Sequence, residues 1–286
     1  MGYLYAIIAS LFQAFYVVPR KFSKASPDVY TYFAALGFLI FALIKYFIDG
    51  GANFIDTRLI ASVGMGICWA VGTVFFMVGI EKIGLAKSRQ WSRFSYPITI
   101  LVAFTFLHEH HSMNMWIFSA VFMAIVVAAW LLTFNTGQGA RALKSGIEYS
   151  LASAIFFGIM PSLLKVASGA NANAQQVVIS ASAVITILLF MLIRRRSLTP
   201  LCKIFTPDHL WPIVGGFGYM ITSLLAILAY RYMPAVIGST IIQLVAVWSI
   251  LIGVFIFGEI SWRRHRHRII LGTALVIAAI LLTLWV

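Results

Sequence analysis

Apolar runs of about 20 residues recur along the whole chain, and they restrict its fold more than any other feature. A helix rises 1.5 Å per residue, so a run of this length crosses roughly 30 Å of hydrocarbon. Apolar residues make up 62% of the 286 residues and charged residues only 10%, whereas a soluble domain carries about a quarter charged residues. Alternating strand patterns of about ten residues are absent. The sequence therefore predicts an all-α integral membrane protein.

Polar or helix-breaking residues separate ten such segments, and the longest polar break, Asn135 to Ser145, falls near the midpoint of the chain. We therefore expect ten transmembrane helices, with ends uncertain by a few residues. They cover residues 2–18, 28–48, 59–80, 85–107, 113–134, 146–166, 174–193, 210–230, 234–257 and 269–285.

The two halves of the chain resemble each other. A shift of 150 residues places Gly66 on Gly216 and Glu109 on Glu259, without a gap over a long stretch. Five helices per half is an odd number, so the second half enters the membrane in the opposite sense. Inverted repeats of this kind are typical of secondary transporters, which bind substrate near the midplane between the repeats. We predict a first repeat over 1–137, an inter-repeat loop over 138–145 and a second repeat over 146–286.

The charge is strongly basic, with 21 Lys and Arg against 8 Asp and Glu and a formal net charge of +13. In a soluble protein this excess would raise nucleic acid as a partner, but here no nucleic-acid partner is expected. Of the 21 bases, 17 fall in the odd-numbered loops or the adjoining helix ends. The positive-inside rule then places these loops in the cytoplasm and both termini outside. We expect the protein in a prokaryotic inner (plasma) membrane, in contact with its lipids.

Two stretches carry a family resemblance: IGLAKSRQWSRFSYPITILVAFTFLHE (83–109) and MPAVIGSTIIQLVAVWSILIGVFIFGE (233–259). Both resemble the EamA-type repeat of the drug/metabolite transporter superfamily, in which a long apolar helix ends in Gly-Glu and the next helix has an early Gly. Phe257-Gly258-Glu259 and Gly272 match this pattern, whereas the first half has His108 in place of the Gly and no early Gly. Residues 73–91 also resemble the glucose, ribose and rhamnose porters. The resemblance implies a transporter fold without specifying a substrate, and it often implies cytoplasmic termini, contrary to the loop charge.

Polar side chains inside the expected helices are candidates for a substrate site, because ionisable groups there are costly unless they face a cavity or a partner. Arg93 lies about two turns into the fourth helix, with Gln90 on the same face. Gln243 is the repeat equivalent of Arg93, and Trp248 follows about one turn later. The alternative is that Arg93 reaches a nearby interface. The remaining large residues with polar tips fit either a pocket wall or an aromatic belt: Gln13, Tyr16, Trp69, Tyr219 and Tyr230.

Two lysines follow prolines in the repeat-related first and sixth helices. Lys21 comes after Pro19, and Lys165 comes after Pro161. A proline kink frees carbonyl groups and lets a helix hinge, so these four residues are candidates for a gate or hinge. Extension of both lysines to the interface explains them equally well.

Several chemistries are not supported by the sequence. All 8 acids fall at or near expected helix ends, so the buried carboxylate of a proton-coupled exporter of lipophilic cations is missing. Arg93 without an acidic partner instead favours a substrate that supplies negative charge or hydroxyls. His108-Glu109-His110-His111 lacks the HExxH spacing, so no metal site is predicted. No phosphate-binding glycine loop or nucleophile elbow is present, so neither an enzyme nor a cofactor is expected.

The sequence therefore predicts a secondary transporter that moves a small polar or anionic metabolite by alternating access. Sugars, amino acids and phosphorylated metabolites all fit this description. The alternative is a flippase for an anionic or sugar-bearing lipid headgroup, which a lateral opening lined by Lys21, Lys165 and Arg93 would favour. A channel would instead show flux without saturation. Coupling to protons, the direction of transport, and a monomeric or homodimeric state all stay open.

Overall fold

The computed structural model describes residues 1–51, 54–108, 115–133, 140–195, 206–259 and 261–283, and within these ranges every regular element is helical. Hydrocarbon offers no water to unpaired backbone groups, and a helix satisfies them within one segment. The first half contains α1 (Gly2–Phe15), η1 (Val18–Lys21), α2 (Pro27–Ile48), α3 (Leu59–Ile83), α4 (Leu85–Ser92), α5 (Ser95–Phe106) and α6 (Met115–Thr133). The second contains α7 (Ala140–Ala167), α8 (Ala172–Arg195), α9 (Pro207–Tyr232), α10 (Ala235–Ile242), α11 (Val245–Leu251), η3 (Ile252–Ile256) and α12 (Trp262–Thr283).

Among the described residues, eight helical stretches are long and apolar enough to cross a membrane. They match eight of the ten expected segments. The expected segment 113–134 corresponds to α6, which has 19 residues. The expected segment 85–107 is not one continuous helix, because it divides into α4 and α5.

Two helix starts also differ from the expected ones. The last helix begins at Trp262 and not near residue 269, so the basic run that starts at Arg263 belongs to its first turns. The helix α7 begins at Ala140, inside the stretch expected as the inter-repeat loop. Both extensions carry basic residues, which are good helix formers.

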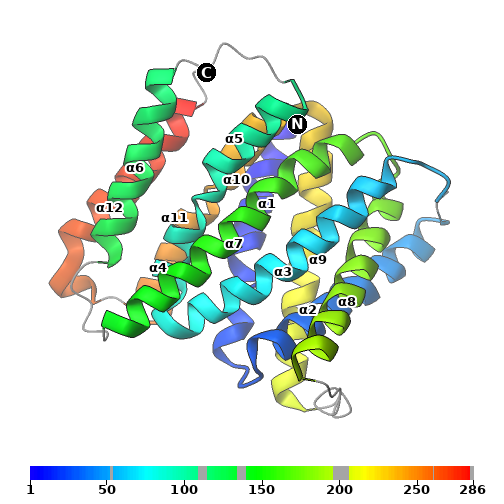
Figure 1. Cartoon of the computed structure of the whole chain (residues 1–286), viewed down its shortest axis with the longest axis horizontal. Helices are drawn as coiled ribbons and strands as arrows, with labels where there is room; N and C mark the ends of the chain where they lie inside the picture. Colours follow the sequence, from blue (N-terminus) through cyan, green and yellow to red (C-terminus); the bar gives the residue numbers. More distant parts are fainter. Residues whose placement is uncertain (52–53, 109–114, 134–139, 196–205, 260, 284–286) are drawn as a thin grey trace.

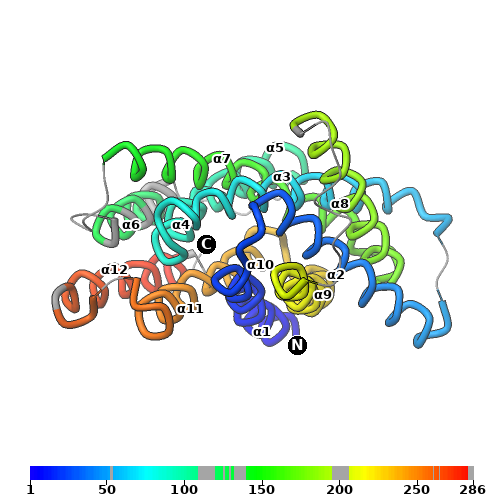
Figure 2. Tube along the Cα trace, turned by 90° about the horizontal axis from the view of Figure 1, so that it is seen from below, coloured from blue at the N-terminus to red at the C-terminus, as the bar shows by residue number. Residues whose placement is uncertain are grey.

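The helices form two layers, with α3 and α7 in one, α1 and α9 in the other, and α10 between them (Figure 2). The helix α3 packs against α7 and α8, while α9 packs against α1 and α2. The N-terminus and the end of α12 lie at one end of the bundle, and η1 and the α3–α4 connection lie at the other (Figure 1). The two halves therefore interleave, and each buries its helices against the other.

Both halves contain a helix break, and the two breaks are 150 residues apart. One lies at Arg93 and Phe94, between α4 and α5, and the other at Gln243 and Leu244, between α10 and α11. At each break a backbone bond shortens to i→i−3, with Phe94 N–H donating to the Trp91 carbonyl at 3.3 Å and Leu244 N–H to the Ile241 carbonyl at 3.0 Å. Both breaks lie inside the protein, where neighbouring groups can compensate for the lost helix bonds.

Glycines allow the closest helix contacts, and two of them occupy the repeat-related positions 66 and 216. A Cβ on Gly66 would lie 2.3 Å from the Ile179 carbonyl oxygen of α8, and one on Gly216 would lie 2.2 Å from the Ala34 carbonyl oxygen of α2. Small residues of this kind let membrane helices approach backbone to backbone. The same device therefore joins α3 to α8 and α9 to α2.

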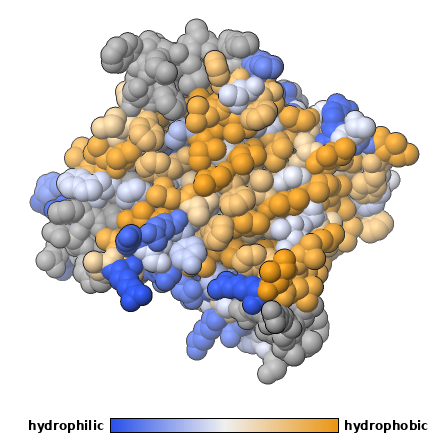
Figure 3. All heavy atoms as spheres, viewed as in Figure 1, coloured by the Kyte–Doolittle hydropathy of each residue, from blue (hydrophilic) through white to orange (hydrophobic). Residues whose placement is uncertain are grey.

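The outer surface has the pattern of a membrane protein. Hydrophobic side chains form a broad band across the viewed face, and many hydrophilic ones gather along its lower margin (Figure 3). Large apolar residues such as Ile60, Ile193 and Phe255 are exposed on it. An apolar surface of this size needs lipid around it, so the protein is an integral membrane protein.

The α3–α8 contact predicts a difference between two glycines of the same helix. Gly66→Ala should destabilise the protein by about 1–3 kcal/mol because its methyl group overlaps α8. Gly64→Ala is the control, since its Cβ would meet Leu163 Cδ1 at an ordinary 3.4 Å. This control should be neutral or stabilise the helix by up to about 1 kcal/mol. Thermal unfolding of the purified variants in detergent measures both, and equal behaviour would contradict the close packing.

Candidate functional site

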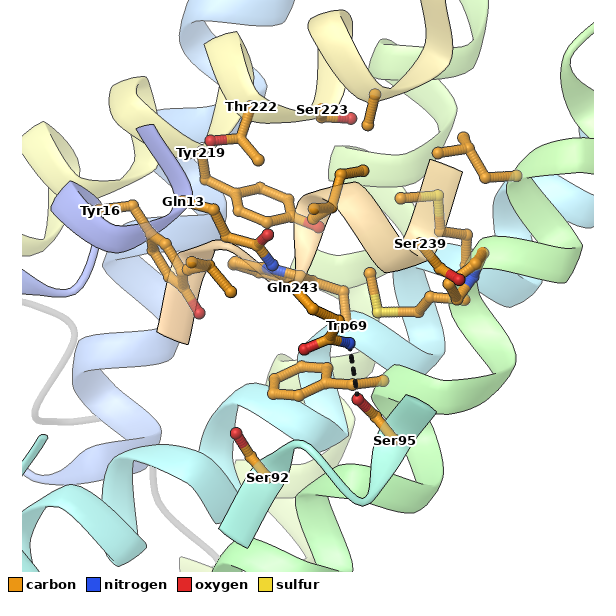
Figure 4. A pocket seen from close by; sticks show the side chains of 18 of the residues that line it. Gln13, Tyr16, Trp69, Ser92, Ser95, Tyr219, Thr222, Ser223, Ser239 and Gln243 are labelled. Atoms are coloured by element: carbon orange, nitrogen blue, oxygen red, sulfur yellow. Dashed lines mark hydrogen bonds between the residues drawn. The ribbon is translucent and has the colours of Figure 1, made fainter. Parts of the chain in front are cut away.

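A central cavity lies within the bundle. Its walls come from α1, α3, α4, α7, α9 and α10, together with residues at both helix breaks. Figure 4 shows polar side chains from both halves of the chain converging on this space. The cavity therefore lies between the two halves and takes groups from each.

One wall of the cavity is aromatic. The rings of Trp69 and Tyr219 have centroids 4.7 Å apart, and Tyr16 meets Tyr219 edge-on at 5.3 Å. Positions 69 and 219 are again 150 residues apart. The indole Nε1 of Trp69 is buried and has no hydrogen-bond partner among the described residues. This wall presents flat apolar faces together with donors that a bound molecule can use.

The lining is also rich in hydroxyls and amides. The Nε2 atom of Gln243 donates to the Ser95 hydroxyl at 3.4 Å across the two helix breaks (Figure 4). Within the described structure, Gln13 Oε1 and Ser223 Oγ are buried without a partner. The other hydroxyl groups in the lining belong to Tyr16, Ser92, Tyr219, Thr222, Tyr230 and Ser239. The cavity can therefore donate and accept several hydrogen bonds.

The helix α4 carries the basic residues of the site. Arg89 lines the central cavity, and its guanidinium lies over the Phe76 ring at 4.2 Å from the centroid. Arg93 is also buried, but it lines a separate pocket of about 180 Å³ with Tyr96, Thr240 and Gln243. Gln243 is the residue that borders both spaces.

The structure brings together most of the predicted substrate residues. Gln13, Tyr16, Trp69, Tyr219 and Gln243 line the central cavity. Gln90, Arg93 and Trp248 are not among the described residues that line it. Gln90 follows Arg89 on α4 and is buried. Trp248 Nε1 donates to the Ser10 hydroxyl at 3.1 Å. The expected faces assumed one straight helix through Arg93 and one through Gln243, whereas the chain breaks at both positions.

Sequence reasoning missed Arg89, Ser92, Ser95, Thr222, Ser223 and Ser239 as lining residues. Arg89 was counted among the loop charges, although it lies in α4 and is buried. A signal was available: Arg89 precedes Arg93 by about one helical turn, and Ser239 is its equivalent 150 residues later. Lys87 is buried on the same helix, so these three bases do not act as simple loop charges.

The predicted gate residues have specific partners. Lys21 forms an ion pair with Glu259 at 2.8 Å, and the same carboxylate accepts the N–H groups of Leu85 and Ala86 at 3.0 and 2.9 Å. Glu259 thus caps the positive end of α4, which favours a carboxylate. Lys165 donates to the carbonyls of Tyr230 and Met233, both at 2.9 Å. Both lysines therefore connect helices and do not simply extend to the surface.

The proline positions differ between the halves. Pro19 lies in the short η1, after α1 has already ended, whereas Pro161 lies inside α7 and lines the cavity.

Among the described residues, no three His, Cys, Asp or Glu side chains are placed to hold a metal. Of the four-residue cluster that starts at His108, residues 109–111 lie outside the described ranges.

Comparison with known proteins gives a family and a fold. The family model described as "Sugar transport protein" matches residues 4–286. A solved structure titled "Crystal structure of protein" aligns with a TM-score of 0.67 at 13% identity, covering 98% of this chain and 94% of that chain. This second likeness concerns the fold alone. The comparison with curated proteins gives no match.

The cap on α4 makes a prediction about Glu259. Glu259→Gln should destabilise the protein by about 1–3 kcal/mol, because it removes the charge that faces Lys21 and two backbone N–H groups. Glu148→Gln is the control, since Glu148 lies 4.0 Å from Lys144 and its side chain is 61% exposed. Its loss should change stability by less than about 0.5 kcal/mol. Thermal unfolding in detergent compares the two, and equal losses would remove the special role of Glu259.

Proposed function

We propose that this chain, which belongs to the family of sugar transport proteins, carries a sugar-type substrate through its central cavity by alternating access. The family and the membrane-helical fold identify a transporter and not an enzyme. The observation that carries the proposal is the cavity itself, which is lined from both halves by aromatic faces and hydrogen-bonding tips.

The chemistry of the lining suits a sugar. A sugar ring has apolar C–H faces and a rim of hydroxyls that both donate and accept hydrogen bonds. Trp69 and Tyr219 offer flat faces for the ring, while Gln13, Gln243 and Ser95 offer acceptors and donors for the rim. The unpartnered atoms Trp69 Nε1 and Gln13 Oε1 are groups that such a substrate would satisfy.

The contacts between helices support two inverted five-helix repeats over residues 1–137 and 146–286. The contact of α1 with α9 has its counterpart in that of α7 with α3, and the contact of α2 with α9 in that of α8 with α3. The contacts of α4 with α7 and of α10 with α1 form a further pair. Together with the two breaks 150 residues apart, this pairing favours ten spanning helices with the substrate site between the repeats.

Alternating access requires a closure at each end of the cavity. The Lys21–Glu259 pair joins η1 to the loop before α12, and Lys165 joins α7 to the end of α9. The element η1 and the C-terminal end of α7 lie at opposite ends of the bundle (Figure 1). We propose that these two contacts open in turn, with Pro19 and Pro161 at the hinges.

The flippase alternative has less support. It called for a lateral opening lined by Lys21, Lys165 and Arg93, but the described lining of the central cavity includes none of these three residues. Each of the two lysines has protein partners, and Arg93 faces a smaller pocket.

We keep the proposed orientation in a prokaryotic inner membrane, with both termini outside. The support comes from basic residues that remain near one end after the buried Arg20, Lys87, Arg89 and Arg93 are set aside, including Lys21, Lys24 and Lys82. A cysteine inserted directly after Met1, in a chain whose two native cysteines are replaced, should be labelled by an impermeant reagent in intact cells if this orientation is right.

Transport by purified protein in liposomes tests the function. Uptake of a transported sugar should saturate, and Trp69→Phe should raise the half-saturating concentration about fivefold to tenfold, because it removes a donor while keeping an aromatic ring. Trp130→Phe is the matched control, since Trp130 is 53% exposed on α6 and should change the value less than about twofold. Unsaturable flux would indicate a channel, and movement of labelled lipid without sugar uptake would indicate a flippase.

Cross-linking tests alternation. Cysteines placed at Lys21 and Glu259, in a chain whose two native cysteines are replaced, should be joined by a short bifunctional thiol reagent because the native side chains touch at 2.8 Å. Joining them should stop net uptake, and a reducing agent should restore it when the linker is cleavable. Uptake that continues in the fully cross-linked protein would show that this end need not open.

A further inference from the structure

Arg89 is a buried cation that lacks a protein counter-charge in the described structure. It is only 4% exposed and lines the central cavity. Its Nε and Nη2 atoms have no hydrogen-bond partner there. The carboxylates that form ion pairs within the described ranges face other bases: Arg20, Lys21, Lys45, Arg58 and Lys144.

A bare buried guanidinium is costly, because burial removes water from the charge and from its N–H donors. One face of Arg89 is covered by the Phe76 ring, which supplies a favourable cation–π contact. That contact leaves the Nε and Nη2 donors, which share one edge of the guanidinium, without a partner in the described structure. The edge is the part that binds a carboxylate or phosphate through two parallel hydrogen bonds.

The charge belongs to one half of the cavity only. The equivalent of Arg89 in the second half is Ser239, which also lines the cavity. The helix α10 (AVIGSTII) has no charged residue, whereas α4 (LAKSRQWS) has two. A bound molecule therefore meets a cation on one side and neutral hydroxyl, amide and aromatic groups on the other.

We infer that the substrate is an anionic sugar, whose carboxylate or phosphate group binds the edge of the Arg89 guanidinium. Its ring then lies against Trp69 and Tyr219, and its hydroxyls meet Gln13 and Gln243. This inference rests on the proposed transport function and narrows its substrate class. The anionic group of the substrate would also supply the counter-charge that Arg89 lacks in the described structure.

The test uses three sugars that share one ring: D-glucuronate, D-glucose 6-phosphate and D-glucose. Each is titrated into the purified full-length protein in detergent, with sodium chloride added to equal ionic strength, and the unfolding temperature is recorded. At least one of the two anions should bind about tenfold or more tightly than glucose, because a charge-assisted hydrogen bond contributes about 1.5–3 kcal/mol. Comparison of the two anions distinguishes a carboxylate from a phosphate.

Variants assign the effect to Arg89. Arg89→Gln should lose the preference for the anion by about tenfold or more, while its unfolding temperature without ligand stays equal or rises, because an unpaired buried charge is removed. Arg89→Lys should keep part of the preference, because it keeps the charge but loses the paired donors. Arg141→Gln is the control for net charge, since Arg141 is exposed on α7 and should leave the preference unchanged.

Several results would overturn the inference. They are equal binding of glucose and both anions, an anion preference that survives in Arg89→Gln, or stabilisation by sodium chloride equal to that by the sugar anions. A preference lost in Arg93→Gln but kept in Arg89→Gln would place the anion in the smaller pocket instead. If Arg89→Gln does not fold, the wild-type preference and Arg89→Lys decide. Saturable uptake of glucose without any anion preference would overturn this inference but leave the transport function intact, and absence of binding by any sugar would overturn both.

Discussion

The rest of the structure depends on the absence of water from the bilayer interior. Backbone N–H and C=O groups must bond within the protein, so the chain crosses as helices and can interrupt them only where protein surrounds the interruption. The two breaks, at Arg93 and at Gln243, meet this condition, since the residues on either side are largely buried. Each break turns polar side chains toward the centre of the bundle. The cavity exists because these two irregularities face each other across the halves.

The polar groups of the protein then fall into two kinds. Some are fully used in holding the bundle together, as Glu259 is by Lys21 and the first N–H groups of α4, and Lys165 by two carbonyls. Others are buried without a partner in the described structure, and Trp69 Nε1, Gln13 Oε1 and the Arg89 donors belong to this group. Buried polar groups are normally bonded, so a cluster of unsatisfied ones around a single cavity points to a ligand. Glu259 and Lys165 lie near helix ends, whereas Trp69, Gln13 and Arg89 line the central cavity.

The 150-residue offset between the two halves predicted more features of the structure than any single residue did. The shift of 150 residues that pairs Gly66 with Gly216 in the sequence also pairs their close contacts with α8 and α2. It pairs Trp69 with Tyr219 in the aromatic wall and Arg89 with Ser239 in the lining. The choice of Arg93 over Arg89 shows where this reasoning ends. Hydropathy and a 3.6-residue period assume a straight helix, and the period cannot say which of two arginines faces a space once the helix turns.

The sequence by itself determined that the chain is a helical membrane protein. Apolar residues make up 62% of it and fall in runs of about 20, the length that crosses a bilayer as a helix. It also contained the repeat and most of the aromatic wall. The two helix breaks have different origins. Pro97 cannot donate a backbone hydrogen bond to the Arg93 carbonyl, which accounts for the first break locally. The second break has Val247 at the equivalent position and occurs without a proline. Packing between the halves must therefore fix that break, so it was decided by the tertiary structure alone.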